Sequence, residues 1–185
     1  MLKPQDALTA CKVFSLGEEP WSYLLLAGSL FLSQGEAHLS VARCLDMGVL
    51  ARDRRNRKKI LVVRRRLHDL CAVVLPMLCR PVRGAVVRGV PTSVRAPCLA
   101  GRFPTTAPPV TPPTVMVWPH DSGEVVLGES LLPVYPTVPR AVRSDARLYE
   151  LLALVDVVRV GSPSERRVAV EYLKETIVGD GRMRP

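Results

Sequence analysis

Residues 22–50 (SYLLLAGSLFLSQGEAHLSVARCLDMGVL) decide the fold, because they predict two short helices joined by a tight turn. Ser22 is suited to cap the first helix, which is expected over residues 23–30. Its inward-facing residues are expected to be Leu24, Leu25 and Ala27. The turn follows at Phe31 and Leu32. Two short helices on a tight turn form the helix–turn–helix unit, which sets its second helix in the major groove of DNA.

The second helix is expected to begin after Ser33, which stands three residues before Glu36 in the spacing of a capping box. Its apolar residues recur with the helical period and form one inward face: Ala37, Val41, Cys44 and Leu45. Gly48 is suited to the left-handed conformation that follows a helix. The same pattern also occurs in ordinary helical cores, and that alternative stays open at this point.

A strongly basic segment follows directly over residues 52–66 (RDRRNRKKILVVRRR), with nine Lys or Arg residues and one acid, Asp53. We expect a short turn or abbreviated wing over residues 52–56 and a fourth helix over residues 58–75, ended by Pro76. The apolar stripe of that helix is expected to be Leu61, Leu67, Leu70, Cys71 and Val74. A helix–turn–helix followed by a basic segment is the order expected of a winged helix.

The excess positive charge lies in the middle third of the chain. The whole chain carries +9, and residues 52–102 alone carry +12, whereas residues 1–51 and 103–185 carry −2 and −1. A concentrated basic patch attracts phosphate through Coulomb steering and counterion release. A solvated basic face that aids solubility is the alternative, and the concentration in one third favours a nucleic-acid partner.

A second basic feature is predicted over residues 82–96 (VRGAVVRGVPTSVRA), where Val alternates with Arg, Gly and Ser. This alternation indicates a short β-hairpin with one apolar face. Near a helix–turn–helix such a hairpin would act as a wing, with Arg83, Arg88 and Arg95 touching phosphates or the minor groove. An ordinary hairpin with arginines on its wet face is an equal alternative.

The remaining residues complete a mainly α fold with a small β-hairpin. A first helix is expected over residues 4–16, with Trp21 as a lid on the resulting three-helix core. The predicted organisation is a winged helix–turn–helix domain over residues 1–99, a Pro-rich linker over 100–119 and a C-terminal extension over 120–185. The extension is expected to hold an antiparallel pair of helices, at 145–160 after a Ser144 cap and from a Ser162–Glu165 capping box onward, as a structural or dimerisation unit.

Several classes of function are disfavoured by what the sequence lacks. The five cysteines are odd in number and contain no C-x-x-C pair, so neither a disulfide framework nor a metal site is indicated. No apolar run reaches the roughly 20 residues of a membrane helix, and the N-terminus does not resemble a signal peptide. No nucleophile–base set or Gly-rich phosphate loop appears. We therefore expect a cytoplasmic protein that is not an enzyme and needs no cofactor.

Residues 20–50 resemble bacterial winged helix–turn–helix regulators of the MarR-like kind. The resemblance is carried by an apolar helix, then the L-S-x-x-E step from Leu32 to Glu36, then a helix closing in Gly48-Val49-Leu50. It implies a three-helix core with a wing, binding of double-stranded DNA, frequent homodimers and transcriptional control. It also implies a DNA-facing set: Ser33, Gln34, Gly35, His38, Leu39, Ala42 and Arg43.

The expected DNA contacts divide into two groups. Base edges or nearby phosphates would be met by Ser33, Gln34, His38 and Arg43. The DNA backbone would be met by Arg52, Arg54, Arg55, Arg57, Lys58 and Lys59, with Arg83 and Arg88 beside them. Leu39 and Ala42 depart from the polar face usual in such regulators. They favour an alternative, a protein-interaction module (antitoxin-like or a complex subunit) whose basic face binds an acidic protein or an RNA.

Overall fold

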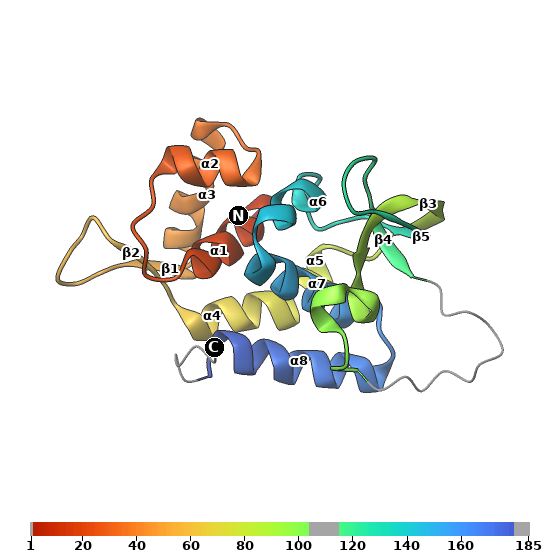
Figure 1. Cartoon of the computed structure of the whole chain (residues 1–185). Helices are drawn as coiled ribbons and strands as arrows, with labels where there is room; N and C mark the ends of the chain where they lie inside the picture. The colour runs from red at the N-terminus through yellow and green to blue at the C-terminus, as the bar shows by residue number, and fades with distance from the viewer. Residues whose placement is uncertain (1, 104–114, 180–185) are drawn as a thin grey trace.

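Three helices form the N-terminal part of the chain in the computed structural model, which describes residues 2–103 and 115–179. They are α1 (Pro4–Leu16), α2 (Tyr23–Leu30) and α3 (Gln34–Asp46) (Figure 1). Their bounds confirm the three predicted helices. Ser22 Oγ accepts a hydrogen bond from Leu25 N at 3.1 Å and so begins α2 as expected. Phe31 closes α2 in the left-handed region, with φ of 54°.

Two details of the helix–turn–helix differ from expectation. The buried residues of α2 are Leu26, Ala27 and Leu30, whereas the expected inward residues Leu24 and Leu25 are 69% and 47% exposed. The uniformly apolar sequence of α2 has no clear periodicity, so local pattern does not choose its face. The Ser33 cap forms, with Glu36 N donating to Ser33 Oγ at 3.1 Å, but Glu36 Oε1 accepts from Gln5 Nε2 instead of completing the capping box.

A β-hairpin follows α3, after Gly48 takes the expected left-handed conformation. Strand β1 (Leu50–Arg52) pairs antiparallel with β2 (Ile60–Val62), with Leu50 opposite Val62. The prediction that a fourth helix begins at Lys58 is therefore wrong. β-Branched Ile60 and Val62 suit a strand, and both pack against the hydrophobic core from this position.

The fourth helical segment runs from Arg64 to Leu78, past Pro76 rather than ending there. It comprises α4 (Arg64–Asp69), a π-helical turn (Leu70–Val74) and α5 (Leu75–Leu78). Proline has no N–H and its ring crowds the carbonyl four residues earlier, and the wider π turn accommodates both effects. The expected stripe is buried at Leu67, Leu70 and Cys71, whereas Leu61 and Val74 are each 37% exposed.

A second sheet replaces the hairpin predicted over residues 82–96. Most of that stretch forms one long strand, β3 (Arg83–Thr92), which pairs antiparallel with both β4 (Met116–Pro119) and β5 (Val126–Leu131), and a 3-10 turn (Ser93–Arg95) follows it. β4 and β5 pair in parallel and close a small three-stranded barrel. Gly89 permits close packing rather than a turn, because a Cβ there would lie 2.2 Å from the carbonyl oxygen of Trp118. The predicted linker is thus wrong at its end, since Met116–Pro119 is a strand; residues 104–114 lie outside the described part.

The C-terminal helices are α6 (Val138–Ala141), α7 (Ala146–Val160) and α8 (Pro163–Ile177). The cap of α7 is Asp145, whose Oδ1 accepts from Leu148 N at 2.9 Å, rather than the predicted Ser144. The Ser162–Glu165 capping box is confirmed. Residues of α7 are buried on every side, and they join residues of α1 and α4 in one hydrophobic cluster. This helix is therefore a core element that residues 1–99 pack against.

Candidate nucleic-acid interface

The loop between β1 and β2, residues 53–59, projects from the body of the molecule (Figure 1). Its one acid, Asp53, shapes the loop: its Oδ1 accepts from Arg55 N at 2.7 Å and from Asn56 N at 3.3 Å. Asn56 forms a second turn of the same kind, because its Oδ1 accepts from Lys58 N at 3.1 Å. Asx turns of this kind stabilise tight loops. The spacing of Asp53 and Asn56 is a turn signal that can be read from the sequence, although a count of charges does not reveal it.

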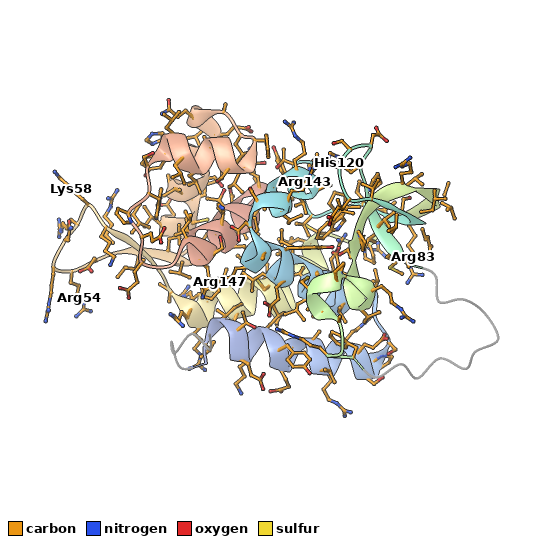
Figure 2. All side chains as sticks on the ribbon, viewed as in Figure 1. Arg54, Lys58, Arg83, His120, Arg143 and Arg147 are labelled. Atoms are coloured by element: carbon orange, nitrogen blue, oxygen red, sulfur yellow. The ribbon has the colours of Figure 1, made fainter. Side chains whose placement is uncertain are left out.

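This loop and the end of β1 carry six cationic side chains. Arg52, Arg54, Arg55, Arg57 and Lys58 are exposed, and Lys59 is half-buried. Across residues 2–103 and 115–179, none of the six forms a side-chain ion pair. Figure 2 shows Arg54 and Lys58 leaving the loop on opposite edges. The hairpin is thus a protruding cationic arm, as the basic segment predicted, built from a full hairpin rather than an abbreviated turn.

The first turns of α3 are also open to solvent. Ser33, Gln34 and His38 are exposed, as expected for residues that could meet a ligand. The His38 ring stacks on Tyr23 of α2, with centroids 3.5 Å apart and planes 16° apart. Leu39, also on this helix, is 60% exposed. The outward face of α3 therefore combines the exposed Gln34 side chain, the capping hydroxyl of Ser33, a stacked imidazole and an exposed leucine.

Arg43 does not lie free on this face, which corrects its predicted role. Its guanidinium forms two hydrogen bonds to Asp6 of α1, Nε to Oδ2 at 2.8 Å and Nη2 to Oδ1 at 2.7 Å. Asp6 is fully buried and also accepts from Ser40 Oγ at 2.7 Å. Burial raises the pKa of the Asp6 carboxyl, but the bonds from Arg43 and Ser40 outweigh it and hold this pKa below its usual value. The Arg43 side chain therefore links α3 to α1.

Arg83 and Arg88 lie on β3, in the second sheet, and not beside the arm. Arg83 lies 3.7 Å from Glu129 of β5, and Arg88 is exposed opposite Leu127. Figure 2 places Arg83 on the far side of the molecule from Arg54 and Lys58. The expected second wing is therefore wrong, because β3 finds its partners in residues 116–131 instead of folding back on itself.

The helix that follows β2 adds only part of its charge to this surface. Arg64 donates to the carbonyl of Ile177 at 3.3 Å, and Arg66 donates to the carbonyl of Met47 at 3.2 Å. Arg65 is exposed. Two of these three arginines thus tie helix ends together, and the candidate interface consists of the arm and the start of α3.

Comparisons with known proteins yield no relative. No protein-family model, curated protein or solved structure matches this chain. Within the described residues, no helix is long and apolar enough to cross a membrane. A role for this surface is therefore inferred from its own side chains.

Proposed function

We propose that this protein is a DNA-binding transcriptional regulator of winged helix–turn–helix type, related to MarR-like proteins, that acts in the cytoplasm as a homodimer. The β1–β2 hairpin is the wing, and α3 is the helix that approaches the major groove. The observation that most supports this proposal is the set of six cations on the protruding arm, none of which has an ion-pair partner among the described residues. Unpaired cations on a projecting hairpin are suited to DNA phosphates.

The proposed DNA contacts of α3 exclude Arg43. Arg43 is held by Asp6, so base contacts from α3 come from Ser33, Gln34 and His38. Gln34 can bond adenine through two hydrogen bonds, and Ser33 can donate its hydroxyl hydrogen to a phosphate. Most of the affinity then comes from Arg52, Arg54, Arg55, Arg57, Lys58 and Lys59. Such binding is strong at low salt, with modest sequence preference.

The test is fluorescence anisotropy with a duplex from the protein's own upstream region and with a scrambled duplex, over a salt series. The double change Arg54→Ala and Arg55→Ala should weaken binding to both duplexes and lower the salt slope by about two units. Tighter binding to the upstream duplex identifies an autoregulator. Absence of binding at low salt would contradict the proposal.

A matched control removes two positive charges elsewhere. Arg167 and Lys174 are exposed on α8, and neither has a recorded side-chain bond in the described part of the chain. Changing both to Ala keeps the net charge equal to that of the Arg54 and Arg55 variant. If the control weakened DNA binding equally, the arm would have no special role and only total charge would matter.

Exposed leucines favour a second candidate, a protein-interaction module of the antitoxin or complex-subunit kind whose basic face binds an acidic protein or an RNA. Leu24 and Leu25 on α2 and Leu39 on α3 are 69%, 47% and 60% exposed. Large apolar side chains on a polar surface are typical of protein contact sites. Copurification separates the candidates: Leu39→Ser should release a bound protein without changing duplex affinity.

A further inference from the structure

A groove of about 400 Å³ lies between the α1–α2 link and the β2 side of the arm. One wall is formed by Glu18, Glu19 and Trp21, and the other by Asn56, Lys58 and Lys59. This volume falls within the range of small-ligand sites, which run from about 300 to 1,000 Å³. The proposed DNA contacts do not account for the groove, because its acidic wall would repel a phosphodiester backbone.

Opposite charges face each other across the groove without meeting. Glu18 and Glu19 are exposed on the link, and neither forms an ion pair with Lys58 or Lys59 in the described residues. A ligand that spans the groove therefore meets cations at one end and carboxylates at the other. The cations suit a phosphate group, and the carboxylates suit N–H donors on the same molecule.

Trp21 supplies a flat surface between these ends. Its ring packs edge-on with Tyr23, with centroids 5.7 Å apart and planes 81° apart, and Tyr23 is in turn stacked on His38. Trp21 therefore does pack against the helical core as predicted, yet it stays only half-buried and lines the groove. A tryptophan fixed in place on one side and open on the other is a stacking platform for a planar ring.

We propose that this groove binds a nucleotide whose base carries an amino group. The base stacks on Trp21, its amino group donates to Glu18 or Glu19, and its phosphate lies against Lys58 and Lys59. The site shares Lys58 and Lys59 with the proposed DNA contacts, whereas Arg54 leaves the arm on the edge opposite to Lys58 (Figure 2).

The test titrates the full chain with AMP and follows tryptophan fluorescence. The chain has two tryptophans, and Trp118 is 1% exposed, so Trp21 is the one that a ligand in solution can reach. We expect AMP to quench the fluorescence in a saturable way. Adenosine and inorganic phosphate should each bind at least about tenfold more weakly than AMP, because each lacks one half of the contacts. Equilibrium dialysis with AMP measures the same affinity without relying on Trp21.

The matched variants are Lys58→Ala with Lys59→Ala, and Arg54→Ala with Arg55→Ala. Both remove two charges from one loop, but only the first pair lines the groove. The lysine variant should weaken AMP binding about tenfold or more, and the arginine variant should bind AMP like the parent. Glu18→Gln with Glu19→Gln should reduce the preference for AMP over UMP, whose base has no amino group. Equal weakening by both pairs, or no AMP binding in dialysis, would overturn the proposal.

Discussion

Arg43 of α3 and Asp6 of α1 form a two-bond ion pair across the N-terminal helices, with contacts of 2.7 and 2.8 Å. The Asp6 side chain is fully buried, and that of Arg43 is 20% exposed. This pair links α3 directly to α1. It also engages the one Lys or Arg of α3, so in the proposed DNA complex the cationic contacts would come from the arm.

Replacing Arg43 with Ala should therefore affect stability more than DNA binding. Asp6 would stay buried without its main partner, and we expect the free energy of unfolding to fall by about 2–3 kcal/mol. Urea denaturation measures this loss. The folded fraction of Arg43→Ala should bind duplex DNA within about twofold of the parent, because Asp6 holds the Arg43 guanidinium and keeps it from the DNA. Loss of a phosphate contact would cost more than this at low salt. A large loss of DNA affinity in the folded variant would restore Arg43 to the interface.

A second ion pair predicts a pH dependence. Asp145 accepts from Lys12 Nζ and from Ser15 Oγ, both at 2.6 Å, and joins α1 to the start of α7. Burial raises the pKa of the Asp145 carboxyl, but these bonds outweigh it and place the pKa below its usual value. A carboxyl with a lowered pKa stabilises the fold above its unfolded pKa of about 4, and this contribution disappears as the pH falls through the folded pKa.

Asp145→Asn isolates that contribution, because Asn keeps the helix cap while losing the charge. At neutral pH the variant should unfold about 3 kcal/mol more easily, since Lys12 is left without its partner. The difference from the parent should shrink as the pH drops below about 4, and it should disappear once the pH lies below the lowered pKa of the folded carboxyl. Denaturation curves over a pH series measure it, and a difference that stays constant would show that the charge has no role.

For a change at Asp53 of the arm, net charge and structure predict opposite effects on DNA affinity. Asp53→Ala removes the only acid of the loop, so charge alone predicts tighter DNA binding. The structure predicts weaker binding, because the turn loses its bonds from Arg55 N and Asn56 N. Asp53→Asn keeps the Asx turn and removes the charge, so it should bind more tightly than the parent. Anisotropy at one low salt concentration ranks the three proteins.

Two glycines with opposite surroundings test the packing. At Gly89 an added Cβ would meet the Trp118 backbone at 2.2 Å, whereas at Gly35 in α3 nothing lies within 4 Å. Gly89→Ala should therefore destabilise the fold by about 2–3 kcal/mol through overpacking. Gly35→Ala should stabilise it by roughly 0.5–1 kcal/mol through helix propensity. Thermal unfolding compares both with the parent, and the same sign of change for both would refute this view of the barrel.

The sequence by itself determined the helices whose signals are local. The Ser22, Ser33 and Ser162 caps, the Gly48 turn and the periodic apolar face of α3 each act within a few residues, which is why these features matched expectation. The concentration of charge in residues 52–59 was also readable. These properties need no knowledge of what packs where.

The tertiary structure alone decided which partners those elements meet. Arg43 and Asp6 are 37 positions apart, and β3 pairs with strands that start at Met116, so no local pattern indicated either contact. The face of α2, the π turn that carries the helix past Pro76 and the groove beside Trp21 likewise depend on neighbours distant in sequence. Local propensity sets the elements, whereas burial and charge pairing between distant segments decide which side chains remain free to bind.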